Sequence, residues 1–501
     1  MYEKRVSAKD VVILGGGLAG LTTAVGLREL GLSVVVIERA RLLGGRARSW
    51  IDGKTGDPVH IGPHIFLNHY PNMMRLLDLC GTRDKVVWET NGRFLTMVDG
   101  QREVPIRASA LPPPYHYVPS LLGDPETTML DLVSNWPLVE LAATIDEAGI
   151  LRLDAMNALD LLREVKVSER FIQRFWSFTA MAIMNVPLEK CSAGALIRFY
   201  RHLVGHADIQ VGFPDGGLGD LYAPQCRALI EAAGGEVRNS TRATSLTGDG
   251  DRVTGVEIVN ADGSTETIEA RFVVAALSPQ ALAKLARPSW AADHAPFGDL
   301  DAFAPVPYVS TFIWFDRKLG PLQFWARAFR EQDLNCDFYD LSNIHRGWRQ
   351  RPSVIASNII YSDRIGKMTD AEIVLRTRDE IAEFLPDARR ATVRHAVVNR
   401  IPMAIHAPAP GTESLRPTTR TGIEGLLLAG DWIKTDFPAS MESAVRSGWM
   451  AAEAIAKDVG QHLDLTRSVL PPVGLVPWLK DYARHFPFKK TPARIRDLAR
   501  G

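Results

Sequence analysis

Short runs of consecutive apolar residues near the N-terminus are separated by a stretch with helical periodicity. The first run, residues 11–14, predicts a strand that is buried on both faces, and residues 34–38 predict a second strand. Between them, apolar residues recur with the spacing of a helix that packs against a sheet, from residue 18 to about residue 30. This order of strand, helix and strand predicts an α/β fold.

The same kind of pattern returns twice further along the chain. Buried strands are predicted at 236–240, 271–276 and 425–429. Residues 253–258 and 265–268 alternate around a turn, which indicates a hairpin. A helix is predicted to begin near residue 439.

The segments between these parts have other patterns. Helices are predicted at 130–143, 150–165, 169–185 and 192–203. Five apolar side chains in the third helix lie at helical spacing, a stripe that either packs in an ordinary core or lines a long apolar tunnel. They are Phe171, Phe175, Phe178, Met181 and Met184. Residues 290–400 predict strands at 306–315, 354–360 and 392–398 and a helix at 372–384.

Composition and charge remove several classes of partner. Of the 501 residues, 46 % are hydrophobic and 23 % are charged, as in a folded chain, and the formal net charge is zero. Because no bulk field attracts nucleic acid, no nucleic-acid partner is expected. Four cysteines without a CxxC pair exclude the common zinc patterns and indicate a reducing compartment. No signal peptide or membrane-spanning run is visible, so we expect a cytoplasmic protein.

A GxGxxG motif, Gly15-x-Gly17-x-x-Gly20, directly follows the first strand. Gly15 permits the tight turn, Gly17 lets a pyrophosphate approach the backbone, and Gly20 lets helix and strand pack closely. At the start of the helix, Leu18 and Ala19 offer unpaired N–H groups to phosphates. The motif predicts a dinucleotide site.

Glu38 and the loop after it indicate which dinucleotide. Glu38, at the end of the second strand, would accept hydrogen bonds from the ribose hydroxyls, and its charge disfavours a 2′-phosphate. The loop that follows contains Arg39 and then Gly44-Gly45-Arg46. It resembles the GG-R motif of the FAD-dependent amine oxidase and carotenoid desaturase superfamily. The resemblance implies FAD, with the loop along its diphosphate and the arginine on phosphate.

Residues 57–72 resemble the plant-type phytoene and ζ-carotene desaturases more specifically. The resemblance places Gly62, Pro63 and His64 beside the isoalloxazine ring, with a positioning role for His64. Pro63 departs from the leucine that is common there. The resemblance also places Arg201 beside a quinone or inhibitor, although a surface arginine is an equally good interpretation.

The closing motif pairs with the opening one. The strand 425–429 ends in Gly430-Asp431, whose carboxylate can hold a flavin-side phosphate or ribitol hydroxyl. The helix that follows, with Met441 and Ala444 in its first turns, would direct its dipole at the pyrimidine end of the ring. Chains of the same superfamily end in this way. The resemblance also implies that the strand containing Val237 passes the adenine.

The predicted fold is therefore α/β, with a Rossmann-like FAD-binding domain of the amine oxidase type interleaved with a mixed-sheet and helical substrate domain. FAD-binding parts are expected at 8–75, 213–288 and 401–460. Substrate-domain parts are expected at 76–212 and 289–400, followed by a tail at 461–501.

The chain lacks a P-loop lysine, a metal triad, GxSxG and HExxH, so no metal site is expected and the chemistry must lie on the flavin. The leading hypothesis is an FAD-dependent oxidoreductase that transfers hydride between flavin N5 and a hydrophobic isoprenoid, as a carotene or phytoene desaturase. The alternatives are a hydroxysqualene dehydroxylase, a flavin amine oxidase and a flavin-binding protein without turnover. An amine oxidase would need an aromatic pair around the ring, for which Trp432 is one candidate.

The tail alternates aromatic and basic residues. Trp478, Tyr482 and Phe486 lie four residues apart among Lys480, Arg484, Lys489, Lys490, Arg494 and Arg496. This pattern suits either the headgroup region of a membrane or a solvated terminal helix. A hydrophobic substrate is expected, while a quinone acceptor and peripheral membrane contact stay open.

Overall fold

A seven-stranded sheet is built around β1 (Arg5–Leu14) in the computed structural model, which describes residues 5–90, 92–485 and 491–500. The strand order is β10-β2-β1-β13-β12-β11, and β19 also pairs with β13. β11 and β12 are antiparallel to their neighbours, and the remaining pairs are parallel. The other strands are β2 (Val34–Ile37), β10 (Glu236–Arg238), β11 (Arg242–Thr247), β12 (Gly255–Val259), β13 (Thr265–Ala275) and β19 (Leu426–Leu428).

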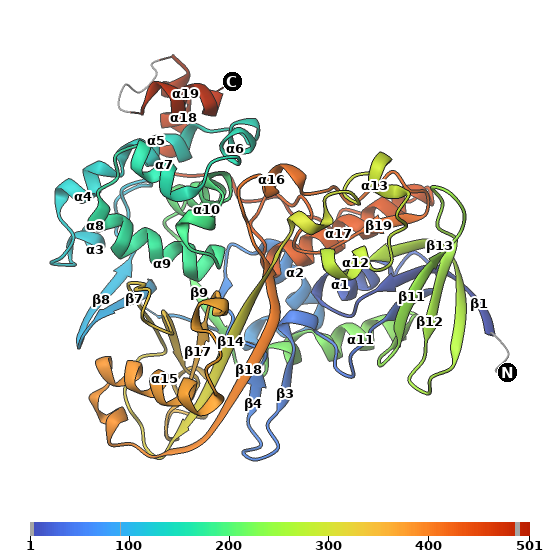
Figure 1. Cartoon of the computed structure of the whole chain (residues 1–501), viewed down its shortest axis with the longest axis horizontal. Coiled ribbons are helices and arrows are strands. Elements are labelled where there is room, and N and C mark those ends of the chain that lie inside the picture. Colours follow the sequence, from blue (N-terminus) through green and yellow to red (C-terminus); the bar gives the residue numbers. More distant parts are fainter. Residues whose placement is uncertain (1–4, 91, 486–490, 501) are drawn as a thin grey trace.

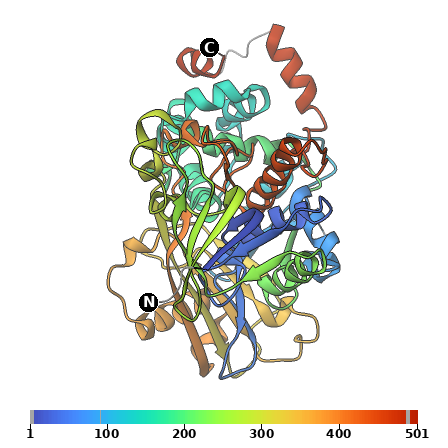
Figure 2. The same ribbon diagram turned by 90° about the vertical axis from the view of Figure 1, so that its right-hand side faces the viewer.

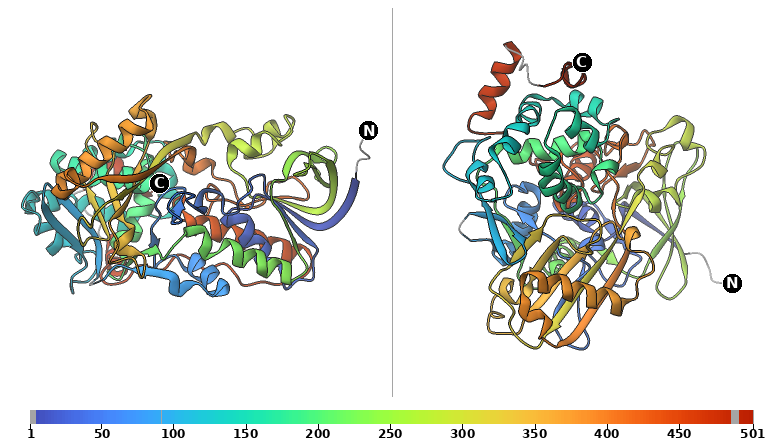
Figure 3. Two further views of the ribbon diagram at one scale, coloured as in Figure 1. Left: turned by 90° about the horizontal axis from the view of Figure 1, so that it is seen from below. Right: turned by 60° about the vertical axis from the view of Figure 1, so that its left-hand side comes forward.

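Both faces of this sheet are covered, which explains the continuous apolar runs in its strands. Val11 and Ile13 face one hydrophobic cluster, and Val12 and Leu14 face another. The first cluster includes three helices that lie side by side: α1 (Leu18–Leu27), α11 (Ala223–Ala232) and α17 (Met441–Asp458) (Figure 3, left). The second face is covered by the segment that contains α12 (Pro279–Ala283) and α13 (Trp290–Asp293).

A second seven-stranded sheet lies at the lower left of Figure 1. Its order is β18-β14-β17-β16-β15-β7-β8, antiparallel except for the parallel pair β15–β7. The strands are β7 (Arg93–Asp99), β8 (Arg102–Arg107), β14 (Pro305–Phe315), β15 (Phe324–Arg327), β16 (Asp337–Asp340), β17 (Val354–Ile359) and β18 (Val393–His406). Helix α15 (Asp370–Phe384) packs on one face through Ile381 and Phe384.

The helical segment lies at the upper left of Figure 1. Its helices are α3 (Val118–Leu122), α4 (Met129–Ser134), α5 (Trp136–Thr144), α6 (Glu147–Leu153), α7 (Ala158–Glu164), α8 (Glu169–Phe171), α9 (Ser177–Thr179) and α10 (Ala193–Gly205). Residues 172–176 and 180–184 are π-helical, so the third predicted helix is one continuous but distorted element. Phe171, Phe178, Met181 and Met184 are buried in the clusters beside the second sheet, as core packing predicts.

Two predicted helices are wrong in their continuity. The segment 130–143 divides into α4 and α5 at Asn135, since Pro137 lies in the first turn of α5 and has no N–H to donate to the preceding turn. The segment 150–165 divides into α6 and α7, where the Asn157 side chain caps a new helix.

The remaining elements are short or lie at the ends of the sheets. Small sheets join β3 to β4 and β5 to β9 to β6. The elements are β3 (Ser49–Ile51), β4 (Pro58–His60), β5 (Phe66–Leu67), β6 (Val86–Trp88), β9 (Val211–Pro214), α2 (Pro71–Cys80), α14 (Leu341–Ile344), α16 (Thr412–Leu415), α18 (Val476–His485) and α19 (Ala493–Arg500). Figure 2 shows α18 and α19 at the end of the molecule that carries the helical segment.

The predicted α/β fold is confirmed: a Rossmann-like unit is interleaved with a mixed-sheet and helical unit. Across the described residues, the helices are all too short or too polar to cross a bilayer. Phe486, Lys489 and Lys490 of the predicted tail pattern lie outside the described residues.

Candidate functional site

The GxGxxG loop leaves no room for side chains at two of its glycines. Gly15 has a left-handed φ of 108°, and a Cβ there would lie 2.4 Å from the carbonyl oxygen of Ala276. A Cβ on Gly20 would lie 1.9 Å from the carbonyl oxygen of Gly15. Leu18 and Ala19 begin α1, as predicted. The loop is therefore shaped by close backbone packing at the end of β1.

Gly17 differs from the other two glycines. It is the N-cap of α1 with an extended backbone (φ −85°, ψ −175°), and the nearest atom to an added Cβ is the Cα of Gly45, at 3.8 Å. The fold itself would therefore tolerate a methyl group here. The two glycines bring the backbones of both loops together with no side chain between them.

Glu38 connects the GxGxxG loop to the second loop. Its carboxylate accepts hydrogen bonds from the backbone N–H groups of Gly16 (2.8 Å) and Ala40 (2.7 Å), and it is buried. Arg39, beside it, is exposed. Val237 lies on the neighbouring strand β10, opposite Val36. The predicted adenosine-side residues are thus gathered at one edge of the sheet.

The GG-R loop joins the two ends of the chain. The N–H of Gly44 donates to the carbonyl of Gly16 (2.8 Å), which places this loop on the GxGxxG loop. Arg46 forms an ion pair of 2.5 Å with Asp431, 385 residues away. Burial alone would raise the pKa of Asp431, but the positive charge of Arg46 lowers it below its ordinary value. Asp431 is therefore held as a carboxylate beside the glycine loops.

The loop from Asp431 to α17 is held by a residue that the sequence does not single out, Arg416. Its buried guanidinium donates to the carbonyls of Asp431 (3.1 Å), Ile433 (2.7 Å) and Phe437 (3.0 Å). It also pairs with the Glu413 carboxylate at 3.2 Å. No local pattern marks this arginine, because its partners lie up to 21 residues further along.

Gly430 and the first turns of α17 complete this edge of the site. The N–H of Gly430 donates to Ser447 Oγ at 2.8 Å, and its φ of 145° is left-handed. Ser440 caps the helix by accepting from the N–H of Ser443, and Met441 and Ala444 follow in the first turns. The first turns of α17 therefore lie beside the end of β19, next to Asp431.

His64 lies in a loop held by the second sheet. Its Nδ1 donates to the carbonyl of Gly62 (2.7 Å), and burial lowers the pKa of the imidazole, so it is neutral. Asn358 of β17 donates to the carbonyl of Pro63 at 3.3 Å, and Ser310 of β14 donates to that of Ile61 at 2.7 Å. These contacts attach the loop to the sheet of the other unit.

Arg201 lies in α10, one turn from Arg198. Arg198 pairs with Glu147 (2.6 Å) and Glu413 (3.1 Å), whereas Arg201 has neither a hydrogen bond nor an ion pair among the described residues. Burial and the nearby charge of Arg198 lower the pKa of the Arg201 guanidinium. Within the described part of the chain, no hydrogen bond or ion pair joins Arg201 to His64.

A buried acid, Asp337 of β16, was not found from the sequence. One of its oxygens accepts from the hydroxyl of Tyr339 (2.9 Å), and the other has no hydrogen-bond partner. Burial raises the pKa of Asp337 to about 6, although contacts with Tyr339 and Asn358 oppose the shift. Asn358 links this acid to the loop of His64.

Asp337 should make the protein less stable as the pH rises. The unfolded chain loses this proton near the ordinary value of 3.8 and the folded chain near 6, so stability falls between these values. Asp337→Asn, which keeps a side-chain oxygen for Tyr339, removes the loss. Its stability relative to the parent should rise by about 1.4 kcal/mol between pH 5 and pH 8, measured by urea unfolding. Asp84→Asn, at an exposed carboxylate, should show no such change.

Trp432 is not placed to frame a substrate. It is 1 % exposed, its indole N–H donates to the carbonyl of Leu277 (2.9 Å), and its ring packs against Phe303. It belongs to the core on the second face of the first sheet. This removes the one aromatic residue that favoured an amine oxidase.

A cavity of about 560 Å³ opens elsewhere, between the second sheet and the segment around residue 90. Seven of its nine lining residues are polar or charged, among them Arg93, Lys318 and Arg349. None of the glycine-motif residues line it. Its chemistry does not match a slot for a hydrocarbon chain.

Known proteins with similar sequences cover most of the chain. The 15-cis-phytoene desaturase of Capsicum annuum is 28 % identical over 467 residues, which span 90 % of this chain and 78 % of that protein. The 15-cis-phytoene desaturase of Synechococcus elongatus is 28 % identical over 89 % of this chain and 95 % of its own. The ζ-carotene desaturase of Synechocystis is 24 % identical over 89 % of this chain and 96 % of that protein.

Solved structures share the fold at lower identity. Putrescine oxidase bound to putrescine superposes with a TM-score of 0.68 and 16 % identity, over 90 % of this chain and 100 % of the other. Cyclohexylamine oxidase from Brevibacterium oxydans superposes with a TM-score of 0.67 and 18 % identity, over the same shares of the two chains. A model of the family of flavin containing amine oxidoreductases matches residues 18–456. The chain therefore belongs to this family and is an FAD-dependent oxidoreductase.

Proposed function

We propose that the chain is a carotene-type desaturase, which transfers hydride between flavin N5 and a long hydrophobic isoprenoid. The observation that carries the proposal is the assembly of two glycine loops and the Arg46–Asp431 pair at one edge of the first sheet. The relatives named phytoene and ζ-carotene desaturase support the substrate class.

The residues present fit FAD. Gly17 and Gly45 face each other without side chains, so a diphosphate can approach both backbones. In the proposed site, Gly15, Gly17, Leu18, Ala19 and Gly20 hold the diphosphate. The adenosine end is held by Glu38, Arg39 and Val237, and the flavin side by Gly45, Arg46, Gly62, Pro63, His64, Gly430, Asp431, Met441 and Ala444. When bound, FAD supplies the hydride acceptor and donor, which no amino-acid side chain can provide.

Gly17→Ala tests this cofactor site without disturbing the fold. Because an added Cβ meets nothing closer than 3.8 Å, the melting temperature of the flavin-free protein should not change. FAD affinity should fall by at least about tenfold, since the methyl group occupies the approach to the backbone. Isothermal titration of the flavin-free protein with FAD measures the change. Unchanged affinity would mean that the diphosphate lies elsewhere.

The surroundings of the site favour a hydrophobic substrate. The helical segment and the strands β14 and β18 meet in one apolar cluster that includes Phe175, Tyr308, Tyr361 and Ile405, all partly buried. Apolar side chains of this kind hold a hydrocarbon and exclude water. The neutral His64, fixed by its bond to Gly62, orients the ring-side loop and carries no charge into this region.

A quinone is the proposed electron acceptor, with Arg201 as its contact. The guanidinium has no partner among the described side chains, so its N–H groups can donate to a quinone oxygen. Arg201→Ala should slow reoxidation of the enzyme by a quinone without changing its reduction by the isoprenoid. Stopped-flow absorbance separates these two steps.

Product analysis in two hosts tests the function. Expressed in a host that makes phytoene, the chain should yield products with a longer conjugated polyene, and its Gly17→Ala variant should not. Squalene formed only in a host that makes hydroxysqualene would instead favour the dehydroxylase. Flavin bleaching by amines would favour an amine oxidase, and a flavin that no substrate reduces would favour a binding protein.

Peripheral membrane contact through α18 is also proposed. Val476 and Leu479 bury one face of this helix against Ala143 and Val204, while Trp478 is 60 % exposed and stacks on Tyr482. With the exposed Lys480 beside them, these rings suit the headgroup region.

Trp478→Ser should reduce sedimentation of the protein with anionic vesicles. Leu375→Ser, at an apolar residue of α15 that is 50 % exposed, should have no effect. Equal sedimentation of both variants would contradict a membrane role for α18.

A further inference from the structure

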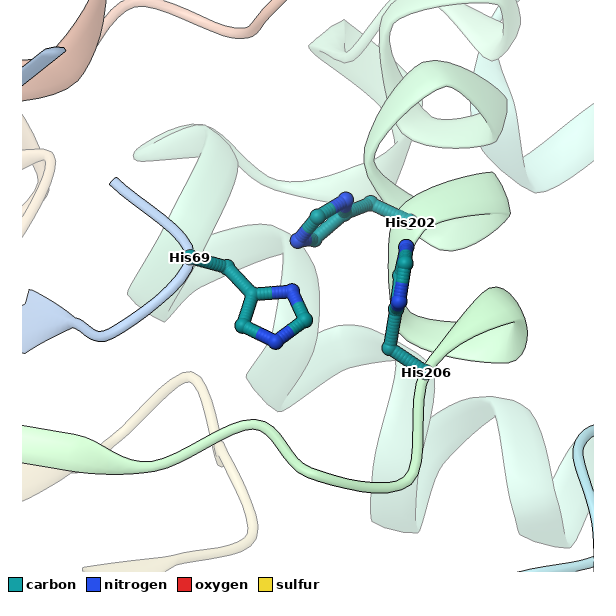
Figure 4. A group of neighbouring side chains, drawn as sticks. All are labelled: His69, His202 and His206. Carbon is teal, nitrogen blue, oxygen red and sulfur yellow. The ribbon is translucent and has the colours of Figure 1, made fainter. Parts of the chain in front are cut away.

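Three histidine rings, one from the loop before α2 and two from the end of α10, face one another (Figure 4). His69, His202 and His206 each offer a ring nitrogen, and these nitrogens all lie within 4.8 Å of one another. The ring centroids are 5.2 Å apart for His69 and His202, and 4.7 Å apart for the other two pairs. All three side chains are buried.

The three rings come from two segments that are tied together. His202 lies in the last turn of α10, and His206 follows the helix directly as its C-cap, with the two ring centroids 4.7 Å apart. His69 lies in the loop between β5 and α2. Beside it, Asn68 donates to the carbonyl of Asp208 (2.9 Å) and accepts from the N–H of Gln210 (2.7 Å). The backbone therefore fixes both sides of the cluster.

Three nitrogens of this cluster, two on His202 and one on His69, lack the partners that buried polar atoms require. His202 is 7 % exposed, and both of its ring nitrogens are buried without a hydrogen bond. His69 is 3 % exposed, and its Nδ1 is likewise unpartnered. Its Nε2 lies 3.1 Å from a carboxylate oxygen of Asp208. Leaving several buried nitrogens unsatisfied is costly, so a ligand that binds them all would stabilise the cluster.

We propose that His69, His202 and His206 bind one divalent transition-metal ion of the zinc class, with Asp208 orienting His69 from outside the ligand set. Imidazole nitrogens are preferred ligands of zinc, cobalt, nickel and copper. Three protein ligands leave one position for water. Because the Asp208 carboxylate contacts Nε2 of His69, Nδ1 of the same ring is left for the metal. This is the usual carboxylate–histidine–metal arrangement.

The distances require only a small contraction. Tetrahedral zinc with bonds of about 2.0 Å places its nitrogens about 3.3 Å apart. The present limit of 4.8 Å therefore closes by about 1.5 Å at most, within reach of ring rotation.

The ion would fasten the loop before α2 to α10. The first residues of α2, Asn72 and Met73, hold the buried Glu442 carboxylate of α17 through bonds of 2.6 and 2.8 Å. The metal would thus connect the helical segment to α2 and, through Glu442, to α17. The sequence alone gives no sign of it, because His69 is remote from the other two ligands.

Metal titration of the full-length flavoprotein tests this site. After treatment with a chelator, the protein should bind one Zn²⁺ or Co²⁺ per chain in a calorimeter, and Co²⁺ should show the intense visible absorption of a tetrahedral site. His69→Ala and His202→Ala should each weaken binding by more than about 100-fold, and Asp208→Asn by about 10- to 100-fold. The melting temperature should rise with Zn²⁺ only in proteins that bind it.

His462→Ala removes an exposed histidine outside the cluster and should bind Zn²⁺ as the parent does. Asp208 is exposed, so Asp208→Asn should fold normally even if the histidine variants do not. The proposal is overturned if the parent binds neither metal. It is equally overturned if Asp208→Asn and the folded histidine variants bind as tightly as the parent.

Discussion

Gly20→Ala should prevent formation of a stable flavoprotein. The added Cβ would lie 1.9 Å from the carbonyl oxygen of Gly15, a separation that no non-bonded pair of atoms can keep. Helix α1 must therefore move away from β1, although every residue of α1 is buried. We expect a loss of about 3 kcal/mol or more in the free energy of unfolding and no retained FAD. Urea unfolding and the flavin-to-protein absorbance ratio measure both effects.

Gly53→Ala is the matched control for this change. No atom lies within 4 Å of its added Cβ, so the stability should stay within about 0.5 kcal/mol of the parent. A Gly20→Ala protein as stable as the control would show that α1 and β1 do not pack as described.

Arg416→Met should have the second largest effect. The substitution removes the donors to the carbonyls of Asp431, Ile433 and Phe437 and leaves those oxygens buried. It also removes one of the two arginines that neutralise the buried Glu413. Breaking such a buried pair from one side costs about 3–5 kcal/mol. Thermal unfolding should show the loss, and FAD should bind more weakly because the backbone at Asp431 is no longer held by Arg416.

Arg420→Met provides the comparison within the same segment. Its guanidinium is 54 % exposed and pairs with Asp458, an interaction worth less than about 1 kcal/mol. If both variants lost the same stability, the contacts of Arg416 would not organise the loop before α17.

The parts of the fold that were predictable have local causes. The opening strand, the glycine turn and α1 follow from apolar runs and from glycine chemistry within a few residues. The helix that begins at Met441 was placed within two residues, because a strand and a Gly-Asp turn precede it. A break in a helix that depends on a single proline or cap, as at Asn135, was missed because the apolar periodicity continues across the break.

Two residues could not be found from the sequence because only the fold gives them their surroundings. The carbonyls that Arg416 binds are brought together by the folded loop, and Asp337 is distinguished by its burial. The strands predicted at 265–268 and 271–276 are one strand, β13, since the same residues pair with β12 at one end and β19 at the other. The roles of the individual flavin-site residues and the bounds of the six segments remain predictions.

The ion pair between Arg46 and Asp431 has a consequence for the biogenesis of the protein. On the ribosome, α1 emerges long before α17, the helix that covers it. Until α17 has been made, the face of α1 that it covers stays exposed, and closing a loop of 385 residues is slow. Loading of the coenzyme is therefore expected only after α17 has been translated, and chains that terminate before α17 should be substrates for chaperones and proteases.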